Sequence, residues 1–139
     1  HDVRRLAACT ADLAIAFDPH AVALWRRRFA EPLSDIESFR IGADGNVLDI
    51  GGRPNALDAV QGQYLGLSLL TPTSWRWFVE LAASRGDGYR VDMTSLFSAL
   101  VRAGHKLVGV PIQGPWGEID SPSDLTLFEE LYFSARASL

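Results

Sequence analysis

Short apolar runs that alternate with helix-start signals restrict the fold of this 139-residue chain most strongly. The clearest run, Leu13 to Phe17, stands between Asp12 and Asp18 and indicates a buried strand. The run at 63–70 is the most apolar of the chain, so we expect it to form a central strand. Further strands are predicted at 37–41, 47–50 and 107–112. The dipeptide Asp44-Gly45 predicts a hairpin turn, because such turns need a residue with positive φ.

Helices are predicted between these strands. They cover residues 2–10, the segment that begins at Pro19, the segment from Thr71 to Gly86-Asp87-Gly88, the segment from Asp92 to Gly104, and residues 122–137. Apolar side chains recur in them at helical spacing. Strands that alternate with helices favour a single α/β domain over 1–139, with a layered mixed β-sheet flanked by helices.

Composition excludes several classes of partner. The net charge is −4, from 13 basic and 17 acidic residues, which disfavours non-specific binding to nucleic acid. The one basic run, Arg26-Arg27-Arg28, is interpreted as the solvated face of a helix. No apolar run approaches the roughly 18 residues of a membrane span. A single cysteine, Cys9, allows no internal disulfide, which fits a cytoplasmic protein. From the charge and the apolar runs, neither nucleic-acid nor membrane partners are expected.

Two acidic side chains stand directly before the last predicted helix. Glu118 and Asp120 are two positions apart, and side chains so spaced project to the same side of extended backbone. Two converging carboxylates repel each other unless a cation or a proton lies between them. Mg²⁺ suits such a place, since it binds through one or two carboxylates together with substrate phosphates. The alternative is a turn with solvated acids.

The residues that follow separate structural roles from binding roles. Ser121 as N-cap, Pro122 at the first helical position and Asp124 predict a capping box, which makes Asp124 structural. Asp120 lies outside the helix and is free to point at a ligand. Trp116 either packs under this loop or covers a substrate.

Four further residues are candidates for substrate binding. Arg53, after Gly51-Gly52, is suited to a phosphate or is part of a structural loop. Gln63 is a buried, satisfied amide or a substrate-facing one. Asp92 is an N-cap or binds a cationic substrate group. Tyr64 belongs to a set of aromatic residues that fit either core packing or a cage for a quaternary ammonium; the set is Tyr64, Trp75, Trp77, Tyr89 and Trp116.

The segment from Trp116 to Leu125, Trp-Gly-Glu-Ile-Asp-Ser-Pro-Ser-Asp-Leu, resembles the C-terminal signature of nucleotidyltransferases with a GT-A-like fold. The branch it looks like holds the small cytidylyltransferases that activate phosphocholine or aminoethylphosphonate, beside the sugar-phosphate nucleotidyltransferases. The resemblance continues through Asp12 to Asp18, Asp44-Gly45, Ile50 to Pro54, Gly62 to Leu67 and Asp92 to Leu96.

The resemblance implies a reaction and a set of roles. The phosphate or phosphonate of a small acceptor would attack the α-phosphate of a nucleoside triphosphate, with CTP favoured and Mg²⁺ required, and release pyrophosphate. Asp120 matches the C-terminal metal ligand, with Glu118 beside it. Arg53 stands where the family often has a lysine that faces the acceptor. Gln63 and Tyr64 would line the acceptor pocket, although family members often have an acid at position 63.

The same resemblance implies that part of the active site lies outside this chain. The family's N-terminal half carries a glycine-rich nucleotide loop and a second metal-binding aspartate, and Ala7-Ala8-Cys9-Thr10 has no glycine. We therefore expect a fragment that lacks the nucleotide-binding half, is inactive alone, and forms a dimer or a complement with that half. The alternatives are a non-catalytic binding or oligomerisation module derived from the same fold, or an unrelated α/β enzyme that uses the carboxylates as acid and base.

Overall fold

A computed structural model describes residues 2–84 and 91–133. Three strands form one sheet in the order β4-β1-β5: β1 is Leu13–Asp18, β4 is Gln63–Leu70 and β5 is Val108–Pro111. β1 runs antiparallel to β4 and parallel to β5. β2 (Phe39–Ile41) and β3 (Val47–Ile50) form a separate antiparallel hairpin. The expected α/β domain with a mixed sheet is confirmed.

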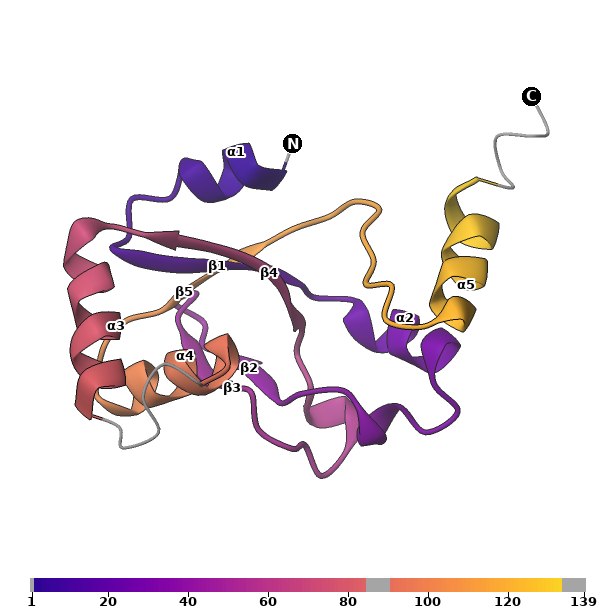
Figure 1. Cartoon of the computed structure of the whole chain (residues 1–139), viewed down its shortest axis with the longest axis horizontal. Helices are drawn as coiled ribbons and strands as arrows, with labels where there is room; N and C mark the ends of the chain where they lie inside the picture. Colours follow the sequence, from indigo (N-terminus) through magenta and orange to yellow (C-terminus); the bar gives the residue numbers. More distant parts are fainter. Residues whose placement is uncertain (1, 85–90, 134–139) are drawn as a thin grey trace.

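The helices lie around this sheet. They are α1 (Asp2–Ala7), α2 (Ala21–Arg28), α3 (Pro72–Ser84), α4 (Met93–Arg102) and α5 (Pro122–Tyr132), with 3-10 turns η1 (Pro32–Ser34) and η2 (Leu57–Ala59). Figure 1 shows α1 above the sheet, α4 and the β2–β3 hairpin below it, and α2 and α5 together beyond one end. The predicted ends of two helices, at Gly86-Asp87-Gly88 and at 134–137, fall outside the described residues.

The sequence prediction for the centre of the sheet is wrong. β1 is central, and its residues from Leu13 to Ala16 are 0% exposed. β4 is an edge strand, where Leu67 is 38% exposed. Gly66 has a φ of 73°, and the β1–β4 register shifts between Ile15 and Phe17. The apolar run is therefore an edge strand with an irregularity at a glycine. The prediction failed because apolar side chains indicate that the faces of a strand are buried, but they do not indicate which strands are its neighbours.

The hairpin forms as predicted. Gly45 has a φ of 79°, which a glycine adopts without steric cost. The carboxylate of Asp44 accepts hydrogen bonds from the side chain and the backbone N–H of Asn46, at 2.7 and 3.1 Å. These bonds lower the pKa of Asp44 below its ordinary value. The turn is thus specified by residues within the turn itself.

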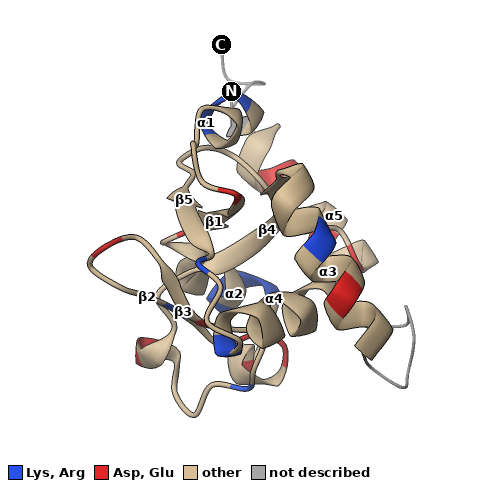
Figure 2. Cartoon of the chain, turned by 90° about the vertical axis from the view of Figure 1, so that its left-hand side faces the viewer, with Lys and Arg blue, Asp and Glu red and all other residues tan. Residues whose placement is uncertain are grey.

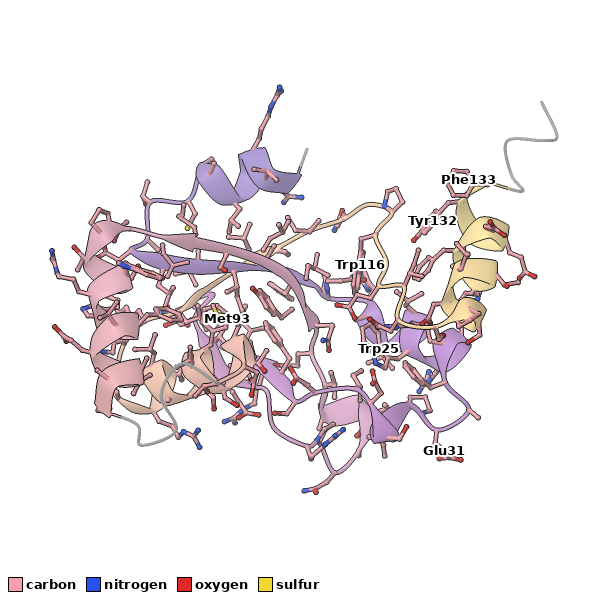
Figure 3. All side chains as sticks on the ribbon, viewed as in Figure 1. Trp25, Glu31, Met93, Trp116, Tyr132 and Phe133 are labelled. Carbon is pink, nitrogen blue, oxygen red and sulfur yellow. The ribbon has the colours of Figure 1, made fainter. Side chains whose placement is uncertain are left out.

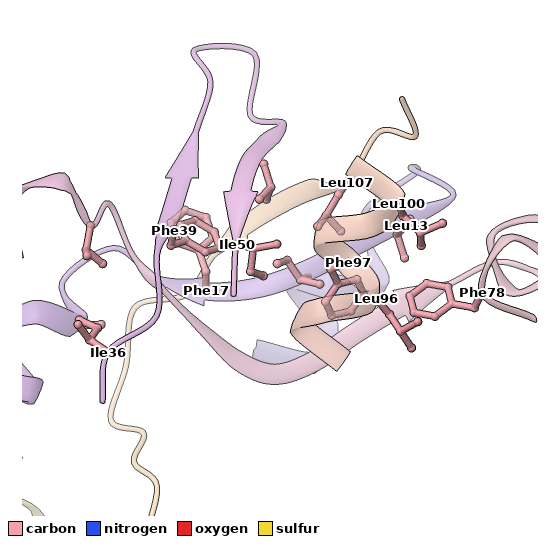
Figure 4. Packing of buried hydrophobic residues seen from close by; sticks show 14 of the residues in the cluster. Leu13, Phe17, Ile36, Phe39, Ile50, Phe78, Leu96, Phe97, Leu100 and Leu107 are labelled. Atoms are coloured by element: carbon pink, nitrogen blue, oxygen red, sulfur yellow. The ribbon is translucent and has the colours of Figure 1, made fainter. Parts of the chain in front are cut away.

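The larger part of the core lies between the sheet, α4 and the hairpin (Figure 4). Phe97 of α4 is 0% exposed and makes edge-to-face contacts with Tyr64 and Phe78, with ring centroids 5.4 and 5.5 Å apart. A smaller cluster on the other face of the sheet packs Leu6 of α1 against Ala14 and Ala16. The two clusters hold β1 from both faces and so fix the position of Asp18 at its end.

The outer surface carries charges of both signs. Figure 2 shows acidic and basic residues interspersed on the side that faces the viewer. Among residues 2–84 and 91–133, every helix is too short or too polar to cross a lipid bilayer.

Candidate functional site

The carboxyl ends of β1 and β5 meet at one edge of the sheet. Phe17 pairs with Pro111 in the parallel ladder, and Asp18 ends β1. The loop at 112–121, which carries Glu118 and Asp120 and is called the acidic loop below, leaves from the same edge after β5. In open α/β sheets, ligands bind outside the carboxyl ends of the parallel strands. This edge is therefore the candidate functional site.

Trp116 connects the acidic loop to the end of β1. Its Nε1 donates a hydrogen bond to Oδ2 of Asp18 at 2.7 Å, and its backbone carbonyl accepts one from the hydroxyl of Tyr132 at 2.9 Å. The ring centroids of Trp116 and Trp25 are 6.0 Å apart. Figure 3 shows Trp25, Trp116 and Tyr132 gathered where the loop passes between α2 and α5. Trp116 packs against the core and also lines a cleft, so its interpretation as a packing residue is supported, and its role toward a substrate stays a prediction.

Gly117 allows the loop to lie directly on α5. A Cβ atom at this position would collide with the ring of Phe128, which is 4% exposed. The backbone just before Glu118 therefore packs against the ring of Phe128. This contact sets where Glu118 and Asp120 leave the loop.

Arg28 is the residue on which the acidic side chains converge. Its Nε donates to Oδ1 of Asp124 at 2.9 Å and its Nη2 to Oδ2 of Asp120 at 2.9 Å. Its Nη1 reaches Oε2 of Glu118 at 3.4 Å. Its side chain is 1% exposed, so the prediction of a solvated basic face is wrong for Arg28, although Arg26 and Arg27 are exposed. The reason is tertiary, because the last turn of α2 packs against α5 and its acidic cap.

Asp124 has a structural and an electrostatic role. The predicted capping box is present, since Oγ of Ser121 accepts from the backbone N–H of Asp124 and Asp124 accepts from the backbone N–H of Ser121. The hydrogen bond from Arg28 is the main cause that lowers the pKa of Asp124 to about 2. Burial alone would lower the pKa of Arg28, but the bonds to Asp124 and Asp120 outweigh it and raise that pKa. Burial raises the pKa of Glu118, and Arg28 opposes that rise.

The low pKa of Asp124 predicts an acid-sensitive contribution to stability. The folded value of about 2 lies below the ordinary 3.8, so this contribution is complete above about pH 4 and is lost as pH falls toward 2. We expect the urea midpoint of the wild-type chain to fall more steeply between pH 4 and pH 2 than that of Asp124→Asn. Parallel curves for the two proteins would contradict the assignment.

The carboxylates of Glu118 and Asp120 offer oxygen atoms that could contribute to a divalent cation site. Three carboxylates face one guanidinium, which leaves an excess of negative charge. Arg28 contacts one oxygen each of Glu118 and Asp120, whose side chains are 39% and 75% exposed. Within the described ranges, no three His, Cys, Asp or Glu side chains are grouped to hold a metal alone. A cation here would therefore combine these carboxylates with water or ligand phosphate oxygens, the usual pattern for Mg²⁺.

A cleft lies beside the acidic loop, with a volume of about 250 Å³. Its polar lining comes from Asp18, His20, Arg27, Trp116 and Tyr132. From the sequence alone, Asp18 is predicted only as the end of a strand. The signal that could have selected it is its position, since an acid that closes a fully buried strand points to the sheet edge where ligands bind.

The other predicted substrate residues are less closely gathered. Arg53 lies in a different depression, with Ser38, Arg40 and Asp49, and its Nη1 donates to the carbonyl of Ser34 at 2.8 Å. Tyr64 faces the core against Phe97. Asp92 is the N-cap of α4, where bonds from the backbone and side chain of Ser95 lower its pKa.

Gln63 lies close to the site. It pairs with Asp18 across the β1–β4 ladder and is 9% exposed. Its Oε1 is buried and makes no hydrogen bond with the described residues. Gln63 is therefore buried, but its side-chain amide is not fully hydrogen-bonded by the described residues, so the interpretation as a satisfied buried amide is wrong.

The described aromatic residues of the predicted cage have separate neighbours. Trp77 stacks on His105, Tyr64 contacts Phe97, and Trp75 is 60% exposed. Tyr89 lies outside the described residues.

Comparison with known proteins finds two similar enzymes. No protein-family model matches the chain. It is 31% identical over 134 residues to the CTP:phosphoglutamine cytidylyltransferase of Campylobacter jejuni, a match that covers 88% of this chain and 51% of the relative. The chain is similar to a known cytidylyltransferase. It is also 30% identical over 138 residues to a bifunctional IPC transferase and DIPP synthase of Rubrobacter xylanophilus, with 98% of this chain and 28% of the relative covered. The chain thus spans about half the length of the first relative and less of the second.

Proposed function

We propose that this chain is the acceptor- and metal-binding part of a cytidylyltransferase-like nucleotidyltransferase. The observation that carries the proposal is the similarity to a CTP-dependent cytidylyltransferase together with an acidic loop at the carboxyl edge of the parallel strands. The substrates are a nucleoside triphosphate, with CTP favoured, and a small phosphorylated or phosphonate acceptor. We also infer that transfer needs the rest of the enzyme, as a dimer or a complement that supplies a nucleotide loop.

The side chains of the site suit this reaction. Asp120 and Glu118 would hold Mg²⁺, and Asp18 at the end of β1 is a third acid at the same edge. When bound, Mg²⁺ offsets phosphate charge and aligns the displacement. His20 and Arg27 line the cleft beside Asp18, where the guanidinium of Arg27 and a ring N–H of His20 can donate hydrogen bonds to the phosphates of a substrate. We retain Arg53 as an acceptor-binding residue, since the charged lining of its depression is two arginines, Arg40 and Arg53, against one carboxylate, that of Asp49.

Pyrophosphate release from CTP tests the proposal. The acceptors are phosphocholine, aminoethylphosphonate and phosphoglutamine, each assayed with the chain alone and with the chain joined to the N-terminal half of the Campylobacter relative. We expect acceptor-dependent release in the joined protein. Asp120→Asn should reduce that release by at least about 100-fold, because several kcal/mol of charge stabilisation are lost.

The exposed acid Asp58, which lies outside the cleft, supplies a matched control. Asp58→Asn should retain wild-type activity. Activity that survives Asp120→Asn would reject the metal assignment. A stable oligomer that neither binds CTP nor releases pyrophosphate in any combination would instead favour the non-catalytic module.

A further inference from the structure

We propose that Arg28 is a positioning residue that holds Glu118 and Asp120 in the arrangement needed to share one divalent cation. This inference rests on the proposed function and adds a residue to its site. Arg28 belongs to α2, far from the acidic loop in sequence, and it would act on the cation only through the two carboxylates.

Arg28 is fixed by contacts that do not involve these two acids. Its Nε is bonded to Asp124, whose side chain is 6% exposed. Its guanidinium lies 4.9 Å from the ring centroid of Trp25 and 5.0 Å from that of Phe29. A side chain that is 1% exposed and held on three sides has little freedom to move.

The two remaining nitrogens of this fixed group reach outward. Nη1 lies 3.4 Å from Glu118 and Nη2 lies 2.9 Å from Asp120. The planar guanidinium fixes the separation of its nitrogens, and therefore limits the separation and the orientation of the two carboxylates. Asp120 is 75% exposed, so Arg28 is the contact that restrains its carboxylate. The oxygens that Arg28 does not contact, Oε1 of Glu118 and Oδ1 of Asp120, are then the donors for a cation.

Positioning and simple charge neutralisation predict different results when Arg28 is replaced by lysine. If Arg28 were only a neighbouring positive charge, its presence would repel a divalent cation, and its replacement by lysine would change nothing. If Arg28 positions the carboxylates, lysine keeps the charge but loses the planar fork, and cation affinity must fall. Loss of a residue that orients metal ligands typically costs 10- to 100-fold in metal affinity.

The test is Mn²⁺ binding to the whole chain in the absence of nucleotide. Electron paramagnetic resonance and calorimetry measure the affinity. Arg28→Lys should bind Mn²⁺ at least about 10-fold more weakly than the wild type. Arg26→Lys is the matched control, because Arg26 is an exposed arginine of the same helix, and it should bind as the wild type does. Near-ultraviolet circular dichroism checks that both variants fold. Equal affinities of Arg28→Lys and the wild type would overturn the proposal and leave the proposed function intact.

A second measurement uses the wild-type chain and does not depend on the folding of a variant. Arg28 is assigned in nitrogen-15 spectra through its contact with Trp25, and Mg²⁺ is added. We expect a saturable shift of the Arg28 Nε–H signal and no shift of the Arg26 signal. An unchanged Arg28 signal in a chain that binds Mn²⁺ would overturn the positioning role. A wild-type chain that binds no Mn²⁺ would overturn both this role and the metal assignment of the proposed function.

Discussion

Replacement of Trp25 with alanine is expected to lower the free energy of unfolding by about 3–5 kcal/mol. Trp25 is 1% exposed, and its Nε1 donates to Oδ2 of Asp35 at 2.9 Å. Its ring also supports Trp116 and Arg28, so the cavity left by alanine would loosen the acidic loop as well as the core. Urea denaturation followed by circular dichroism measures the loss.

Two further tryptophan variants give this prediction its controls. Trp75 is 60% exposed on α3, so Trp75→Ala should remain close to the wild type in stability. Trp25→Phe keeps most of the buried ring but removes the hydrogen bond to Asp35, and should cost about 1–3 kcal/mol. Equal stability of Trp25→Ala and Trp75→Ala would show that Trp25 does not support the fold as described.

Arg28→Met is expected to destabilise the chain by about 3–5 kcal/mol near neutral pH. Methionine retains the unbranched apolar stem of the arginine, but it leaves the buried carboxylate of Asp124 without its counter-charge and leaves three acids together with no cation. The loss should become smaller below about pH 4, because protonation of Asp124 removes the unpaired charge. Urea midpoints at pH 7 and pH 3 measure both effects.

The neighbouring arginine supplies the comparison for this variant. Arg26 is exposed, so Arg26→Met should leave the urea midpoint close to that of the wild type at both pH values. A loss in Arg28→Met that grows in acid, or that matches Arg26→Met, would contradict a buried ion pair between Arg28 and Asp124.

Features that depend on neighbouring residues could be predicted from the sequence. The Asp44-Gly45 turn, the N-cap at Asp92 and the capping box of Ser121 and Asp124 each depend on groups within a few positions, and all three are confirmed. The strands and helices also lie where the apolar patterns place them, within one to three residues at most ends. Local backbone chemistry is sufficient for such features.

Features that depend on distant residues could not be predicted in the same way. The basic run 26–28 has no local sign that its last arginine is buried, because the two acids that pair with Arg28 at 2.9 Å lie 92 and 96 positions away. The hydrogen bond from Trp116 to Asp18 spans 98 positions. The edge position of β4 depends on which strand pairs with β1 on its other side, and that strand is β5. The resemblance to a nucleotidyltransferase selected Glu118 and Asp120, but it did not select Arg28, which contacts both of them.

The parallel pairing of β1 with β5 has a consequence for biosynthesis. A ribosome completes β1 and α2 well before β5, the acidic loop and α5 exist, since the chain grows from its N-terminus. The ion pairs of Arg28 span 90, 92 and 96 positions, so they close only after the acidic loop and the start of α5 have been made. During synthesis Arg28 is an unpaired cation on a helix without its packing partner. The acidic site therefore forms after the turns and local caps of the residues that precede it.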